Sequence, residues 1–188
     1  MVSKLLFLLY QVVLRLRDFV QGQTNHQGDR RQFVVGINFA GPALTIEGDR
    51  WLSFKEALAL GLSMPDIQLA HSYVRPSPET TYSITKMLNT VAFKAKTVTL
   101  HQPLGDGPYD LYLWVMENHQ SDWHSLKVST GDQVLAPAIG QLKLGNWAKY
   151  GPYRVTVSQG RLDLTLTSNS LADAHLMGMS IFAADRTS

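Results

Sequence analysis

Cysteine is absent from this 188-residue chain. The absence excludes disulfide frameworks, thiolate zinc sites and cysteine nucleophiles together. It does not indicate a cellular compartment, because exported proteins can fold without disulfides.

Charge is also sparse: charged residues make up 17% of the chain and the formal net charge is +2. The basic residues are scattered apart from short pairs such as Arg15 with Arg17 and Arg30 with Arg31. Binding to a phosphate backbone needs a basic stripe, so we expect no nucleic-acid partner. The length and a hydrophobic content of 45% instead fit one globular domain with a full core.

Residues 1–20 differ from the rest of the chain. An apolar run extends from Leu5 to Leu14 with only Gln11 interrupting it, which is shorter than the roughly 20 residues that span a bilayer. Its length is typical of an export signal, whereas the charges that follow at once, and apolar residues recurring at spacings of three and four, indicate an amphipathic helix. Both interpretations stay open, and a helix could support self-association through residues 5–20. Residues 21–32 read as a linker.

From residue 33 to residue 188 the chain alternates apolar and polar residues with the period of two that is typical of strands. A single short helix is predicted, over Phe54 to Leu62. Many strands separated by turn residues predict an all-β fold, an antiparallel β-sandwich of the jelly-roll type. The predicted strands include Phe33 to Phe39, Tyr109 to Met116, Trp123 to Val128, Tyr153 to Val157, Leu162 to Leu166 and Met177 to Ala183.

Several of these strands resemble those of malectin and malectin-like domains, within the wider class of galactose-binding-like carbohydrate-binding modules. The resemblance depends on the order and spacing of motifs over most of the chain after the linker. The motifs are Val35 to Pro42, Gly107 to Glu117, Trp123 to Gly131, Val155 to Leu166 and Met177 to Ile181.

The resemblance implies sugar binding without catalysis. In malectin, loop aromatics and an aspartate hold the ligand in a cleft. The equivalent loop here runs from Glu117 to His124 and includes Asp122, while Asn118 and His119 stand where the family has an aromatic pair. Asp173 matches the family aspartate, which precedes the last strand. The predicted ligand-binding residues are Glu117, Asn118, His119, Asp122, Trp123, Asp173, Tyr73, Tyr82, Trp147 and Tyr150.

The aromatic members of this set have a second interpretation as core residues. Trp123 either begins a strand and packs in the core or contacts a ligand. Trp147 and Tyr150, if both are exposed, would form a stacking platform for a polysaccharide. Tyr73 and Tyr82 lie in the variable region from which further cleft tyrosines would come.

Sequence motifs for catalysis are missing: there is no Gly-x-Ser-x-Gly elbow, phosphate loop or His-Glu-x-x-His. A glycosidase needs two carboxylates across a cleft, and Glu117 with Asp122 or Asp173 would be the pair. His119 and His124 are five residues apart and lack an evident third ligand, so a catalytic metal is not expected. Jelly-roll modules often carry a structural calcium held by oxygen ligands, which leaves calcium as the one open cofactor.

We therefore expect a secreted or extracytoplasmic, non-catalytic module that binds a glycan or polysaccharide through edge loops. The alternative is a protein–protein interaction or structural module that oligomerises through the N-terminal helix. A glycoside-active enzyme is the third option.

Overall fold

The computed structural model describes residues 32–184. The predictions for residues 1–20 and for nearly all of the linker lie outside the described residues. The strands are β1 (Phe33–Asn38), β2 (Leu44–Ile46), β3 (Asp49–Ser53), β4 (Gln68–His71), β5 (Thr90–Lys94), β6 (Thr97–Pro103), β7 (Gly107–Met116), β8 (Leu126–Thr130), β9 (Gln133–Ile139), β10 (Trp147–Val157), β11 (Arg161–Ser168), β12 (Ala174–Leu176) and β13 (Gly178–Ala183), and the helices are α2 (Phe54–Ala59) and α3 (Tyr82–Leu88).

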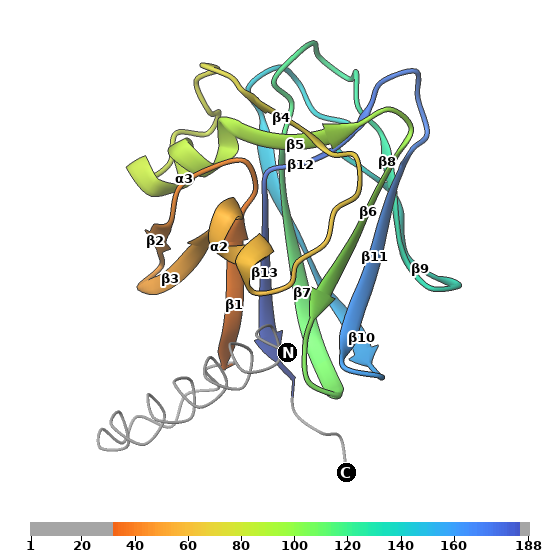
Figure 1. Cartoon of the computed structure of the whole chain (residues 1–188). Helices are drawn as coiled ribbons and strands as arrows, with labels where there is room; N and C mark the ends of the chain where they lie inside the picture. Colours follow the sequence, from red (N-terminus) through yellow and green to blue (C-terminus); the bar gives the residue numbers. More distant parts are fainter. Residues whose placement is uncertain (1–31, 185–188) are drawn as a thin grey trace.

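The predicted β-sandwich is confirmed (Figure 1). One sheet has six strands in the order β10-β7-β13-β1-β3-β2, and the facing sheet has four in the order β6-β11-β8-β9. A third sheet, β12-β5-β4, lies across the end of the sandwich where β7 ends and β8 begins. The pairing is antiparallel except between β1 and β3, which run parallel. This one parallel pair lies at the sheet edge, where β2 and β3 form a hairpin and α2 follows β3 directly.

The helices differ from the sequence prediction in number and length. Helix α2 begins at the predicted residue, where Ser53 and Glu56 form a reciprocal capping box, but it ends at Ala59 rather than Leu62. Helix α3 was not predicted, and Thr81 caps it. Its seven residues include the β-branched Ile84 and Thr85, which lower helix propensity, and it is too short to show a clear helical period.

Strand β7 is buried on both faces and separates two cores. Leu111, Leu113 and Val115 point into the main core between the two large sheets. Trp114 and Met116 point to the opposite face, as the alternation of a strand requires. There they pack in a second core with α3 and with Trp51, whose ring meets Trp114 edge-on at 6.0 Å between centroids. Only 2% of Trp114 is exposed, so its ring is part of this core and not a binding surface.

Candidate functional site

Glu117, the first residue after β7, organises the loop that leads to β8. Its side chain is buried, and its carboxylate accepts hydrogen bonds from the backbone amides of His119 at 3.0 Å, Gln120 at 3.3 Å and His124 at 3.1 Å. The backbone of Glu117 is also fixed, since its amide donates to Asn146 and its carbonyl accepts from Gly145. One buried carboxylate therefore fixes the shape of the loop, because its oxygens accept from the loop's own amides rather than from solvent.

The three-stranded sheet forms a wall beside this loop. In β5, Ala92 faces the main core, so the alternating residues Val91 and Phe93 face the other way. His175 of β12 is the register partner of Phe93 and therefore shares its face. The sequence alternation thus places one face of the sheet on the sandwich core and the other toward the loop.

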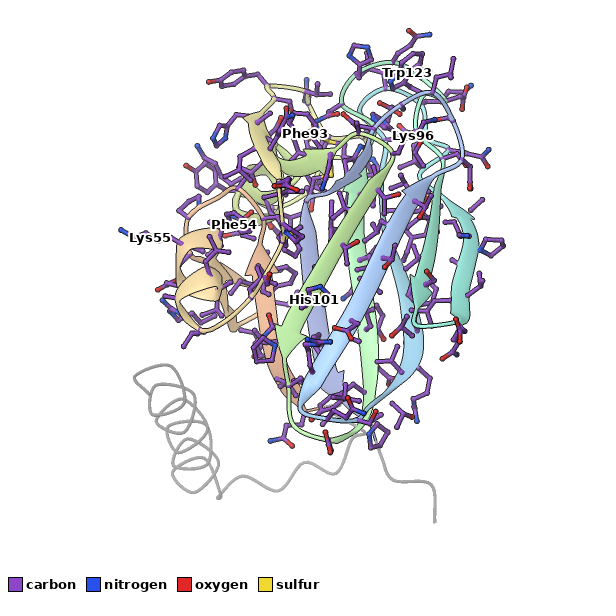
Figure 2. The ribbon with its side chains drawn as sticks, turned by 45° about the vertical axis from the view of Figure 1, so that its right-hand side comes forward. Phe54, Lys55, Phe93, Lys96, His101 and Trp123 are labelled. Carbon is purple, nitrogen blue, oxygen red and sulfur yellow. The ribbon has the colours of Figure 1, made fainter. Side chains whose placement is uncertain are left out.

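Between the loop and the sheet lies a pocket of about 320 Å³. Four of the six histidines of the chain line it: His71, His119, His124 and His175. Trp123 and Phe93 contribute aromatic surface, and Figure 2 shows both at the same end of the sandwich. Asn118 and Asp173 add polar groups that can accept or donate hydrogen bonds to a ligand.

His124 is the central residue of a buried polar cluster at the base of this pocket. Its Nδ1 lies 2.9 Å from Oε2 of Glu117, and its Nε2 lies 3.1 Å from Oδ1 of Asp173. The ring of His175 meets the ring of His124 edge-on, with centroids 3.9 Å apart. Nδ1 of His175 lies 3.7 Å from the same Oδ1 of Asp173.

The charges of this cluster follow from these contacts. Burial alone would raise the pKa of Glu117, but hydrogen bonds from the His119 amide and from His124 hold that pKa below its usual value. Burial opposes charging of His124, yet its hydrogen bonds to Asp173 and Glu117 raise its pKa overall. The pKa of Asp173 is well below its usual value despite burial, because His124 and His175 are beside it. Burial lowers the pKa of His175 and keeps its imidazole neutral.

The structure brings together Asn118, His119, Trp123 and Asp173 of the predicted set. Trp123 is 36% exposed, and its ring lies 5.5 Å from that of His119. The core interpretation of Trp123 is wrong, because β8 begins only at Leu126 and Trp123 lies in the preceding turn.

Two carboxylates of the predicted set do not line the pocket. Glu117 lies behind it, with its acceptor sites used by the loop. Asp122 has a left-handed backbone conformation with φ of 58°, and its side chain is paired with Lys143 on the outside of the loop. Asp122 therefore shapes the turn that presents Trp123.

The remaining predicted aromatics lie elsewhere. Trp147 stacks on Trp114 at 5.8 Å between centroids and donates from Nε1 to the carbonyl of Pro78. Tyr150 packs against the main core on the opposite face of β10, and its hydroxyl accepts from the Gly140 amide. The expected Trp147–Tyr150 platform is wrong, because the two rings serve different cores. Tyr73 and Tyr82 are highly exposed, and Tyr73 lines a neighbouring pocket that shares His71 with the first.

Sequence reasoning missed His175, Phe93 and His71, and it did not include His124 among the ligand-binding residues. A usable signal was present for His175, since Asp173 and His175 are two residues apart in an extended segment and so share a face. No local signal connects Phe93 and His71 to the loop, because pairing of β4 with β5 brings them there.

Comparisons with known proteins show the fold. No family model matches the chain, and no curated protein matches it. Among solved structures, the β-glucuronidase of Bacteroides uniformis is similar with a TM-score of 0.67 at 12% identity, over 80% of this chain and 18% of that protein. The ANXUR2 extracellular domain from Arabidopsis thaliana is similar with a TM-score of 0.66 at 12% identity, over 82% of this chain and 49% of that one.

A third similar structure is the plant receptor-like kinase FER in its complex with the plant peptide RALF23 and LLG2, with a TM-score of 0.60 at 14% identity. It is matched over 85% of this chain and 41% of that chain. The chain thus spans less than half the length of each of these three proteins. The malectin-like resemblance seen in the sequence motifs is supported at the level of the fold.

Among residues 32–184, no helix is long and apolar enough to cross a membrane.

Proposed function

We propose that this chain is a non-catalytic carbohydrate-binding module and that the pocket between the β7–β8 loop and the three-stranded sheet is its glycan site. The observation that carries the proposal is the exposed Trp123 ring standing beside Asn118 and Asp173 at one pocket.

The pocket offers both kinds of contact that a sugar needs. A sugar ring has a patch of C–H surface, which stacks on aromatic faces, and hydroxyls, which need fixed donors and acceptors. Trp123 and Phe93 supply aromatic surface. The half-exposed Asp173 carboxylate is ionised, because its pKa is held low, and accepts strongly from hydroxyls.

The size of the pocket limits the ligand. Small-molecule sites typically enclose about 300–1,000 Å³, and this pocket of about 320 Å³ lies at the lower end. We therefore propose recognition of one or two sugar units, as at a chain end, rather than a long stretch of polysaccharide.

The placement of the carboxylates supports binding without hydrolysis. A glycosidase needs two carboxyl groups facing each other across the scissile bond. Asp173 is the one carboxylate among the residues that line the pocket. Glu117 is buried behind it with its oxygens hydrogen-bonded to the loop, and Asp122 faces Lys143 outside.

The test is a glycan array probed with the purified full-length chain, followed by calorimetric titration of any glycan that binds. The Trp123→Ala variant removes the stacking surface, and Tyr82→Ala is the matched control, because Tyr82 is an exposed aromatic outside the pocket. Binding that is lost in Trp123→Ala and kept in Tyr82→Ala supports the proposal. No glycan bound by a chain with a cooperative melting transition, or equal loss in both variants, contradicts it.

A protein or peptide partner is the second candidate function. The similar FER structure is a complex with the peptide RALF23 and with LLG2, which makes a peptide or protein partner a candidate for this chain too. Some of the similar structures are extracellular domains, which supports a secreted or extracytoplasmic location for this chain.

Self-association through residues 5–20 stays a prediction. Sedimentation analysis of the full chain and of a chain lacking those residues tests it.

A further inference from the structure

The His124 cluster holds three side chains from two separate parts of the chain around one small space. One nitrogen of His124, one nitrogen of His175 and one oxygen of Asp173 all lie within 4.8 Å of one another. Two ligands that each lie about 2.1 Å from a tetrahedral ion are about 3.4 Å apart. The distance from Oδ1 of Asp173 to His124 Nε2 is 3.1 Å and to His175 Nδ1 is 3.7 Å, so the two distances bracket that separation.

The proton positions on His124 point the same way. The Glu117 carboxylate lies against Nδ1 of His124 and holds a proton there, because a carboxylate accepts and does not donate. With that proton placed, Nε2 of neutral His124 presents a lone pair to the Asp173 carboxylate, and two acceptors cannot bond each other. The space between them therefore takes a positive charge, either a second proton on His124 or a metal ion.

A carboxylate behind the distal nitrogen is also the usual support for a metal-bound histidine, since it fixes the tautomer and the ring orientation. Glu117 occupies this position, and its own oxygens are fixed by three backbone amides. The cluster thus contains three side chains that can bind an ion and, in Glu117, a carboxylate that supports one of them.

His175 supplies an independent observation. It is 1% exposed, and within the described part of the chain its Nε2 has no hydrogen-bond partner. Its Nδ1 is 3.7 Å from Asp173, which is longer than a normal hydrogen bond. Neither nitrogen of this buried ring thus makes a hydrogen bond of normal length, which is rare in folded proteins. Nδ1, on the Asp173 side, is the nitrogen that an ion would bind, and Nε2 would then carry the ring proton of the neutral imidazole.

We propose that His124, Asp173 and His175 bind a divalent transition-metal ion of the zinc class, with Glu117 as the positioning residue behind His124. Two nitrogens and one oxygen match the ligands that zinc prefers, whereas calcium takes oxygens alone. Three protein ligands leave one coordination position for water or a ligand hydroxyl, and all three residues line the pocket. This inference does not depend on the glycan proposal.

The test uses the purified full-length chain, first stripped with a chelator. Titration with Zn²⁺ against a chromophoric competitor gives stoichiometry and affinity, and Co²⁺ gives a visible absorption band when nitrogen and oxygen ligands surround it. We expect one ion per chain. His175→Gln and Asp173→Asn should each weaken Zn²⁺ binding by more than about 100-fold, because loss of an outer supporting partner alone costs about 10–100-fold. Glu117→Gln should fall within that smaller range.

Two matched controls are available. His119→Gln changes a histidine that lines the same pocket outside the cluster. His101→Gln changes a histidine of β6 that pairs with Asp163 of β11. His101 lies away from the Trp123 end of the molecule in Figure 2. Both should bind Zn²⁺ as the unchanged chain does.

A second measurement needs no variant in the cluster. In the unchanged chain, addition of Zn²⁺ should shift the NMR signals of the imidazole nitrogens of His124 and His175. The signals of His101 should not change. Absence of one-to-one binding overturns the proposal and leaves His124 as an imidazolium between two carboxylates. Binding that shifts His71 and His119 instead of His124 and His175 also overturns it.

Discussion

Nδ1 of His124 lies 2.9 Å from Oε2 of Glu117, and both side chains are almost completely buried. The pair joins the end of β7 to the residues just before β8, so it closes the loop that presents Trp123 and His119. This buried contact fixes the shape of the loop, because Glu117 also accepts from backbone amides and His124 also contacts Asp173.

Glu117→Gln is expected to destabilise the chain by about 3 kcal/mol, because the buried His124 keeps only one of its two carboxylate partners and three backbone amides lose an ionised acceptor. Urea unfolding followed by tryptophan fluorescence measures the change. The control is Asp163→Asn, which breaks the partly exposed His101–Asp163 contact and should cost no more than about 1 kcal/mol. Equal effects of the two substitutions would show that Glu117 has no special structural role.

The metal-free chain is expected to lose stability as the pH rises above about 6.5. The pKa of His124 is raised in the folded state above its ordinary value of 6.5. Its contribution is therefore fully present below 6.5 and is lost as the pH passes through the folded value. Glu117 and Asp173, the carboxylates facing it, have lowered pKa values and are already ionised there. Neighbouring His175, whose pKa is lowered, adds no slope above 6.5.

The measurement is a series of urea midpoints between about pH 6 and pH 9 in the presence of a chelator. The unchanged chain should show a falling midpoint, and His124→Gln should show a flatter profile over the same range, because it lacks the titrating group. Parallel profiles for the two proteins would contradict the assignment to His124.

Trp123→Ala is expected to weaken binding of the recognised glycan by about 10-fold or more, since an aromatic platform contributes about 1 kcal/mol beyond its buried area. Trp123→Phe should keep part of the affinity, because a smaller aromatic face remains. Calorimetric titration compares the variants, and equal affinity of all three proteins would place the ligand elsewhere. Stability should change little in either variant, since Trp123 is at the surface.

Gly36→Ala is expected to destabilise the chain by about 1–3 kcal/mol through overpacking. A Cβ at this position would lie 2.4 Å from the ring of Trp51, which is itself packed in the second core. Gly105→Ala is the matched control, because its Cβ would meet only Tyr109 at an ordinary 3.6 Å. Thermal unfolding distinguishes the two, and a neutral Gly36→Ala would show that Trp51 can move.

The sequence predicted the sandwich well because alternation along β7 and β11 is strong and turn residues mark the strand ends. It also grouped Asn118, His119 and Trp123, which line one pocket because they belong to one loop; their role as ligand-binding residues stays a prediction. It did not assign a ligand role to His124, because its partner Asp173 is 49 residues away in the sequence. Burial of Glu117 was equally invisible, since an acidic residue after a strand is usually solvated.

Because the two faces of β7 lie in different cores, unfolding of one core affects the other. Leu113 and Trp114 are neighbours on one strand, yet they belong to the main core and to the second core respectively. If α3 and β2 separated from the sheet, one face of β7 would be exposed, and β7 also packs against the opposite sheet through its other face. Deuterium uptake by the central amides of both cores should report one shared opening event, so the chain behaves mechanically as a single body rather than as a sandwich with an appended lobe.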